Sequence, residues 1–548
     1  MIRIWSSPAT RDRGYAVAPI VVALLVGLPL VFVLAALVRP PGESWQHLRS
    51  TLLGGYIIDT AVLAFGVTVC ASLIGTGLAW FTTNFEFPGV RVFAWAVALP
   101  IALPAYISAY TYSHITGVTG PMFTFARWLF GRDIALGILF DMMSLPGCIF
   151  VMTFALYPYV YLSARAFFAG SSRHLIESAR AYGHSDTRVF FSVALPIARP
   201  AILGGASLVL METLNEYGAT SYFGVQSMVT GIYRSWFSLG DIDSALRLAA
   251  VFLLAAVVVL TAERMLRGRR RFHHGTMAPQ SLNKPSRRSA LFMCLSCAAA
   301  TSLGLLIPFA QLLAFSARSA SFASIADLAG ITFRSVVLSG AGGALCVLVS
   351  LALVLSIRRS RGALVRVTHE IVAAGYAIPG AIVVVGILSG SRVASRFSSL
   401  LLIGSIALLL YAYLIRYLAV VMRPLQSGLD KIPESFDDAG ALSGRSWVSV
   451  FFGVHAPILR SAIGAGFFIV CIDLLKELPM TLVLRPFNFA TLATRAFEFA
   501  QQDRLAEAAL PSIVIVLVGL LPAISLARKA NPGEKDLVNK RSELIRAA

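Results

Sequence analysis

Two stretches decide the architecture of this chain: LIESARAYGHSDTRVFFSVALPIARPAI at 175–202 and SFDDAGALSGRSWVSVFFGVHAPILRSAI at 435–463. When Gly183 is aligned with Gly444, the two stretches are offset by 261 residues and share one pattern. The other matched pairs include Glu177 with Asp438, Ala179 with Gly440, Val193 with Val454, and Pro196 with Pro457. A repeat of this length predicts a chain built from two related halves.

The repeat extends outward from these stretches into the neighbouring apolar segments. METLNEY lies over IDLLKEL without a gap, which pairs Glu212 with Asp473 and Glu216 with Glu477. Earlier in the halves, DTAVLAFGVTV pairs with RSVVLSGAGGA at the larger offset of 275. The first half therefore holds extra residues, which we place in the long loop 115–146.

The composition predicts a membrane protein. Of the 548 residues, 57% are apolar and 13% are charged, against about 45–50% and about 25% in soluble proteins. Twelve runs of about 20 apolar residues are long enough to cross a bilayer. They lie at 15–38, 57–81, 92–114, 147–169, 201–223, 244–262, 290–315, 335–357, 367–389, 399–422, 461–484 and 506–527. We predict an all-α polytopic membrane protein with about 12 transmembrane helices in two parallel-duplicated six-helix halves.

The charge distribution predicts the orientation. With both termini in the cytoplasm, the cytoplasmic segments hold more than twice as many Lys and Arg residues as the outer loops, as the positive-inside rule requires. The net charge of +19 is thereby explained without nucleic acid. The N-terminus has the basic-then-apolar order of a signal peptide, but its apolar run exceeds the usual 7–15 residues, so we interpret it as a retained span.

Each repeated loop is expected to form a short helix, a turn and a second helix that enters the membrane. The acidic and small residues at its start favour a helix N-terminus. The glycine permits a left-handed cap at the end of that helix. For a single loop an ordinary helix-turn-helix is the simpler explanation, whereas the repetition favours a shared function.

The repeated pattern resembles the EAA loop of permeases that belong to binding-protein-dependent ABC importers. Within that family, the chain looks like fused ferric-iron permeases over both halves. The departures are conservative swaps of acid and small residues, together with Ala456, where the pattern prefers Leu. The resemblance assigns ATPase coupling to Glu177, Ser178, Ala179, Gly183, Pro196, Asp438, Ala439, Gly440, Gly444 and Pro457.

The resemblance also implies domains and a location in the bacterial inner membrane. The expected parts are a tail, first span and outer loop at 1–54; a first permease domain at 55–263 with coupling loop 171–200; a basic cytoplasmic linker at 264–289; span 7 and an outer loop at 290–332; a second permease domain at 333–528 with coupling loop 430–460; and a cytoplasmic tail at 529–548.

The implied partners are a homodimer of ATPase subunits, an outer substrate-binding protein and membrane lipid. None of the six lysines follows a glycine, so the chain has no G-x-x-x-x-G-K-[ST] phosphate loop. ATP and Mg are therefore expected on the ATPase, and this chain is expected to bind no cofactor, to have no catalytic residues and to hold no stable metal site.

The implied activity is inward movement of ferric iron by alternating access. Thiamine, a polyamine or a phosphonate are alternative cargoes for the same class of permease. A secondary transporter of the major-facilitator type is the alternative from another class. It usually carries a glycine- and arginine-rich signature between spans 2 and 3, where this chain has FTTNFEFPGV.

Four acids inside apolar spans are candidates for the translocation pathway: Glu212, Glu216, Asp473 and Glu477. Each costs roughly 2.5–3.5 kcal/mol on insertion scales, so such residues indicate a pathway by default. Their spacing predicts that the two acids of each half share a helical face, and oxygen ligands suit a hard cation such as Fe³⁺. The structural alternative is an ion pair between Asp473 and Lys476, with the glutamates hydrogen-bonded between helices.

Overall fold

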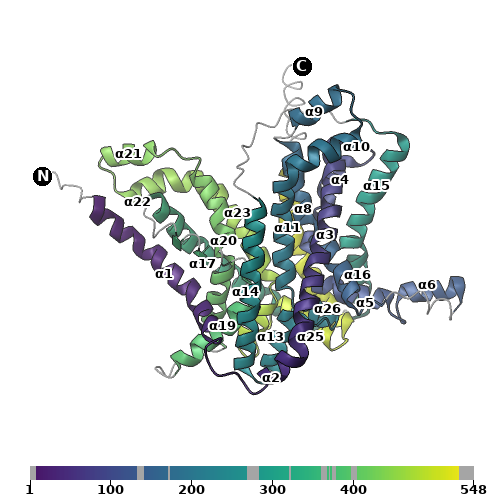
Figure 1. The fold of residues 1–548 in the computed structure, drawn as a ribbon, viewed down its shortest axis with the longest axis horizontal. Helices are drawn as coiled ribbons and strands as arrows, with labels where there is room; N and C mark the ends of the chain where they lie inside the picture. The colour runs from purple at the N-terminus through teal and green to yellow at the C-terminus, as the bar shows by residue number, and fades with distance from the viewer. Residues whose placement is uncertain are drawn as a thin grey trace. The chain divides into compact units, whose positions relative to one another are not determined.

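The computed structural model describes most of the chain, and Figure 1 shows its helices. The described residues are 8–131, 141–170, 173–267, 283–319, 322–359, 367–368, 371–372, 375, 378–395 and 404–529. Within them the protein is all-helical, apart from an isolated bridge between Phe85 and Asn283. Parts of the predicted linker, loops and tails lie outside the described residues, namely 1–7, 132–140, 171–172, 268–282 and 530–548.

Among the described residues, eight helices are long and apolar enough to cross a membrane, or up to nine if one bent pair forms a single span. Three shorter apolar helices accompany them: Pro19–Ala35, Gly380–Ala394 and Leu505–Leu520. The span predicted at 92–114 is wrong as a single straight helix, because the chain bends by 94° between Val90–Ala102 and Ala105–Phe130. Pro104, which lacks a backbone N–H and restricts the residue before it, stands at that break.

The helices form two compact units, which we call unit 1 and unit 2. Unit 2 comprises 52–230, 257–321 and 496–548. In it, the Tyr157 and Tyr161 hydroxyls donate to the carbonyls of Val97 and Ala94, both at 2.8 Å. Its helices are α3 (Leu53–Asn84), α4 (Val90–Ala96), α5 (Ala105–Thr116), α6 (Pro121–Phe130), α8 (Leu145–Ala169), α9 (Arg173–Ala181), α10 (Asp186–Val189), α11 (Leu195–Asn215), α12 (Gly218–Tyr222), α15 (Arg287–Thr301), α16 (Ile307–Ser319) and α26 (Leu505–Lys529).

Unit 1 comprises 1–51, 231–256 and 322–495. In it, α1 packs against α17 and α19, and α20 packs against α17 and α23. Its helices are α1 (Pro8–Ala35), α2 (Trp45–His47), α17 (Phe322–Arg359), α19 (Gly380–Ala394), α20 (Ile406–Leu429), α21 (Ser435–Leu442), α22 (Trp447–Val450), α23 (Ala456–Leu475) and α24 (Pro479–Leu484). Helices α13 (Met228–Phe237), α14 (Ile242–Arg267) and α25 (Leu492–Gln501) have residues in both units.

Neither unit is a continuous stretch of sequence. The predicted domains 55–263 and 333–528 supply the central helices of unit 2 and unit 1, respectively. Helix α1, which precedes the first of these domains, belongs to unit 1, whereas α15 and α16, which precede the second, belong to unit 2. Residues 231–256 of the first predicted domain also belong to unit 1, and residues 496–528 of the second belong to unit 2, so each unit combines helices from both halves of the sequence.

Candidate coupling loops and membrane acids

The first repeated loop has the predicted order of helix, glycine turn and second helix. Helix α9 ends at Ala181, and Gly183 follows with φ of 81°. The Gly183 N–H donates to the Arg180 carbonyl at 2.9 Å, and the Ser185 side chain then caps α10. A π-helical turn leads from α10 into α11, which has Pro196 in its first turn. The left-handed glycine predicted here is confirmed.

The second repeated loop has the same local structure. Helix α21 ends at Leu442, and Gly444 has φ of 66°. The Gly444 N–H donates to the Ala441 carbonyl at 3.1 Å, and the Ser446 side chain caps α22. Another π-helical turn leads into α23, with Pro457 in its first turn. The second predicted glycine cap is confirmed as well.

Gly440 explains one departure from the repeated pattern. A Cβ atom at Gly440 would lie 2.5 Å from the Val450 Cγ2 atom, which is too close for an undistorted contact. The equivalent residue of the first loop is Ala179, whose side chain packs against the core of unit 2. The close Val450 side chain of α22 therefore favours glycine at this position of the second loop.

Aromatic side chains anchor the first loop to unit 2. Ile176 of α9 is only 2% exposed. The Arg180 guanidinium lies 5.8 Å from the ring centroids of both Trp80 and Phe85. Its Nε atom also forms an ion pair with the Asp186 carboxylate at 2.9 Å. Apolar burial and one cation therefore hold α9 against the end of α3.

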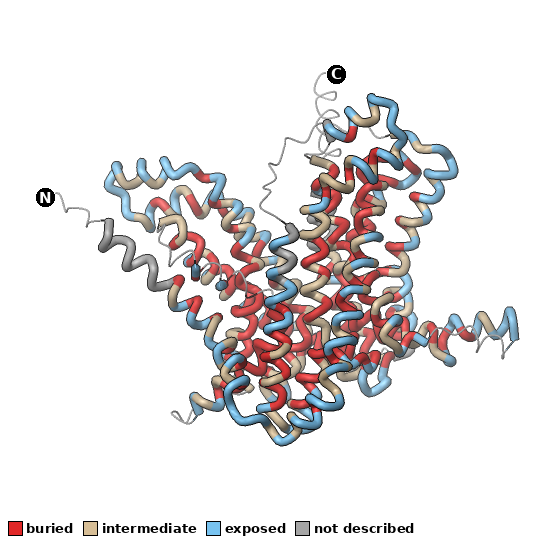
Figure 2. The backbone as a smooth tube through the Cα atoms, viewed as in Figure 1, coloured by how far each residue is buried: buried red, intermediate tan, exposed pale blue. Residues whose placement is uncertain are grey.

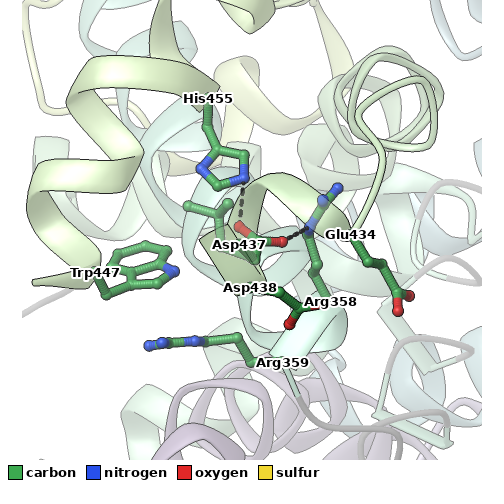
Figure 3. A pocket seen from close by; sticks show the side chains of 8 residues that line it. Arg358, Arg359, Glu434, Asp437, Asp438, Trp447 and His455 are labelled. Atoms are coloured by element: carbon green, nitrogen blue, oxygen red, sulfur yellow. Dashed lines mark hydrogen bonds and ion pairs between the residues drawn. The ribbon is translucent and has the colours of Figure 1, made fainter. Parts of the chain in front are cut away.

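An ion pair and a buried histidine anchor the second loop to unit 1 (Figure 3). The Asp437 carboxylate lies between the Arg358 Nε atom, at 2.6 Å, and the His455 Nε2 atom, at 2.9 Å. Arg358 also donates to the carbonyls of Leu429 and Pro433 at 2.9 and 3.1 Å. The His455 side chain is 1% exposed. Helix α21 is therefore tied to the end of α17 by what we call the charged anchor, namely Arg358, Asp437 and His455.

The charged anchor borders a small cavity. The cavity has a volume of about 130 Å³. The Arg359 guanidinium covers the Trp447 ring beside it, 5.1 Å from the ring centroid. The lining residues are Leu355, Arg358, Arg359, Glu434, Asp437, Asp438, Trp447 and His455.

Sequence reasoning missed the charged anchor. At the offset of 261, Asp437 and His455 correspond to Ile176 and Ala194, both of which are buried in the first loop. The sequence did contain one indication of the charged anchor: these two positions are polar in the second loop and apolar in the first. The carboxylate of Asp438, which the repeat did single out, is exposed beside it.

The acidic residue that begins each coupling motif, and the residue after it, lie at the surface. Glu177 and Ser178 are exposed on α9, and Asp438 and Ala439 are exposed on α21. Large apolar side chains accompany them: Leu175 and Tyr182 in the first loop, and Phe436 and Leu442 in the second. Figure 2 shows α21 as a largely exposed segment. Each loop thus presents acidic, small and apolar groups together, which is a surface suited to binding a protein.

Two of the candidate pathway acids cap short helices. Helix α11 ends at Asn215 and α23 ends at Leu475, so Glu216 and Glu477 do not continue a shared helical face as predicted. The Glu216 carboxylate accepts a hydrogen bond from the Ala219 N–H at 2.8 Å. Glu477, which is 5% exposed, accepts from the backbone N–H groups of Met480 and Thr481 at 3.0 Å each, and from the Thr481 hydroxyl at 2.6 Å.

The other two acids remain within their helices. Asp473 forms the expected ion pair with Lys476, at 2.9 Å, and Glu212 lies half-buried on α11. Among the residues that the structure describes, no group of three or more His, Cys, Asp or Glu side chains is placed to hold a metal ion.

Comparison with known proteins finds a family model that is similar to the part of the chain containing the first loop. Residues 71–267 match the family model of the binding-protein-dependent transport system inner membrane component. The match includes the whole first loop, with Glu177, Gly183 and Pro196.

Individual relatives extend the similarity to most of the chain. The Fe(3+)-transport system permease protein FbpB 2 of Haemophilus influenzae is 24% identical over 520 residues, which cover 92% of this chain and 97% of the relative. The sulfate transport system permease protein CysT of Escherichia coli is 25% identical, over 45% of this chain and 90% of the relative. A probable molybdenum ABC transporter permease of Haloferax volcanii is 28% identical, over 36% of this chain and 70% of the relative.

Proposed function

We propose that this chain, which is the inner-membrane permease component of a binding-protein-dependent ABC transporter, moves ferric iron inward by alternating access. The chain is a transport subunit and not an enzyme. The family implies an ATPase and a substrate-binding protein as partners. The proposed arrangement is two six-helix halves with about 12 spans, both termini cytoplasmic, and an ATPase homodimer that engages both repeated loops.

The observation that carries the coupling proposal is the repeated surface of the two loops. Both have a short helix, a glycine with positive φ and a serine cap, in the same order. Both expose an acid and a small residue next to large apolar side chains. We assign coupling to Glu177, Ser178, Ala179, Gly183 and Pro196 and to their counterparts Asp438, Ala439, Gly440, Gly444 and Pro457. In this proposal, the exposed part of each short helix contacts the ATPase, and its anchored part transmits the movement of the ATPase to the membrane span that follows.

The proposed fusion of two halves explains the coverage of the relatives. The sulfate permease is matched over 90% of its length by less than half of this chain, whereas the ferric-iron permease matches nearly the whole chain. A fused permease supplies both coupling loops in one polypeptide, so a single copy serves an ATPase homodimer.

The cargo rests on the full-length similarity to the ferric-iron permease. The test is uptake by proteoliposomes that contain this chain, its ATPase and its binding protein. We expect ATP-dependent uptake of Fe³⁺ and little uptake of sulfate, molybdate, thiamine or a polyamine. Uptake of one of these instead of iron would change the cargo and leave the transporter class intact. Uptake by this chain alone, driven by an ion gradient, would contradict the class.

A cation route lined by Glu212, Glu216, Asp473 and Glu477 remains a prediction. The hydrogen bonds of Glu216 and Glu477 to backbone N–H groups provide a structural role for both carboxylates. If they also contact the cation, replacing both with Gln should lower iron uptake at least about tenfold, equivalent to roughly 1.4 kcal/mol in the barrier, at a normal protein level. A well-folded double variant with normal iron uptake would contradict the route.

A further inference from the structure

Helix α6 stands apart from the other helices of unit 2. It points away from the bundle, crosswise to α3 and α15 (Figure 1), and most of its surface is exposed (Figure 2). Phe123 is its one buried residue. The loop that contains α6 is the site of the extra residues of the first half, so nothing in the repeat accounts for it.

The chain fixes the direction of α6 through a tight turn. The His114 ring at the end of α5 contacts the Phe315 ring of α16, with centroids 4.8 Å apart. A Cβ atom at Gly120 would lie 2.0 Å from the His114 carbonyl oxygen, so only glycine fits this turn. Pro121 begins α6, and Gly131, with φ of 83°, ends it. Helix α6 is therefore a separate ten-residue element held in place by its first turn.

The exposed face of α6 is apolar and aromatic. Phe125, Trp128 and Leu129 are 63%, 78% and 51% exposed, and Met122 is exposed beside them. At 100° per residue these four side chains fall within an arc of about 120°. Arg127 lies on the opposite side with Phe123 and Phe130, and Thr124 lies at the edge of the arc, next to Trp128. Such a face needs a cover, since exposed apolar patches of this kind mark an interaction surface.

We propose that α6 lies in the lipid headgroup region, with Met122, Phe125, Trp128 and Leu129 inserted toward the acyl chains. Helix α5, which precedes α6, packs against α16. Together with η4 (Ser302–Leu306), α16 belongs to a candidate membrane span that exposes Leu306 and Leu313, so α6 begins beside a surface suited to lipid. Trp and Phe are favoured at the membrane interface. Arg127 lies on the opposite side, where it reaches lipid phosphates. In the proposed orientation, this is the outer leaflet.

Insertion of α6 into lipid would fix the position of the end of α5 relative to the bilayer. The direction of α6, crosswise to the spans, is the one that an interfacial helix requires. A substrate-binding protein that docks on the same side would be the alternative cover for this face. The two alternatives predict different surroundings for Phe125 and Leu129 when no other protein is present: lipid in the proposal, and water if a binding protein normally covers this face.

Spin labels at single cysteines test the proposal in the full chain, with its six native cysteines replaced. The variants are Phe125→Cys and Leu129→Cys, with Arg127→Cys as the matched control opposite the apolar face and Thr124→Cys as a control at the edge of that face. All four positions are exposed, so the fold should survive. The protein is reconstituted in vesicles of phosphatidylethanolamine and phosphatidylglycerol, and collisions with oxygen and with a water-soluble nickel complex are measured.

We expect labels at 125 and 129 to favour oxygen over the nickel complex by at least about threefold relative to the controls. Equal access of the nickel complex at all four positions would place the face in water and overturn the proposal. Shielding at 125 and 129 that arises only when a binding protein is added would also overturn it, in favour of a protein-docking surface.

Discussion

The two repeated loops have the same backbone and different anchors. In the first, Ile176 is buried and Arg180 lies against two aromatic rings; in the second, Asp437 joins Arg358 to His455. The glycine caps and serine caps recur in both. The two loops therefore share the backbone shape of the exposed helix. They differ in the side-chain contacts that attach this helix to the rest of its unit. This difference indicates that the exposed backbone shape does not depend on one particular set of supporting contacts.

Replacing both cap glycines should have the largest effect, because it disrupts the left-handed turn that the two loops share. Valine at Gly183 and Gly444 must adopt a left-handed conformation at a cost of about 1–2 kcal/mol each, which displaces the end of α9 and α21. We expect iron uptake by the double variant to fall at least about tenfold while ATP hydrolysis continues. Asparagine at both positions is the matched control, since it tolerates this conformation. Full uptake in the valine variant would argue against coupling by these loops.

Breaking the charged anchor should affect the second loop alone. Asp437→Ala leaves the Arg358 guanidinium without its carboxylate, at a cost of about 1–3 kcal/mol. We expect faster hydrogen exchange in α21 and unchanged exchange in α9.

Replacing the whole charged anchor with apolar residues should restore slow hydrogen exchange in α21. Arg358→Met, Asp437→Ile and His455→Ala together remove every member of the charged anchor and introduce the residues found at 176 and 194. Replacing all partners of an ionic network by apolar groups is often close to neutral. Exchange in α21 should then return toward the original rate. If the triple variant is less stable than Asp437→Ala, the two anchors are not interchangeable.

Removing the cation of the first loop should have the smallest effect. Arg180→Met retains the apolar contact with Trp80 and Phe85 and loses the cation–π interaction and the ion pair with Asp186, which together are worth about 1–2 kcal/mol. Exchange in α9 should rise modestly, and less than exchange in α21 rises in Asp437→Ala. A larger effect in α9 would show that Arg180, and not the burial of Ile176, holds the first loop.

Local sequence patterns predicted much of the fold and of the loops. Most of the apolar runs lie largely on helices, the glycine position predicted both left-handed caps, and the spacing of Asp473 and Lys476 allowed the ion pair that the structure has. Each of these depends on residues close in sequence.

Contacts between residues far apart in the chain could not be predicted from these local patterns. Arg358 and Asp437 are 79 residues apart, and each is an ordinary loop or helix-end charge until the fold joins them. The membership of α1 in unit 1 also depends on tertiary packing, which apolar periodicity does not encode. The helix ends at Asn215 and Leu475 were missed because the apolar runs continue beyond them.

Cross-linking in the assembled transporter tests the central claim most directly. Single cysteines at Ser178 and Ala439, one in each loop and both exposed, would be treated with a short cross-linker in the presence of the ATPase. Thr124 on α6 is the control position. We predict that both loop cysteines cross-link to the ATPase and that position 124 does not. Cross-linking at neither loop, in a complex that still hydrolyses ATP and imports iron, would contradict the assignment of the two loops as the ATPase contacts.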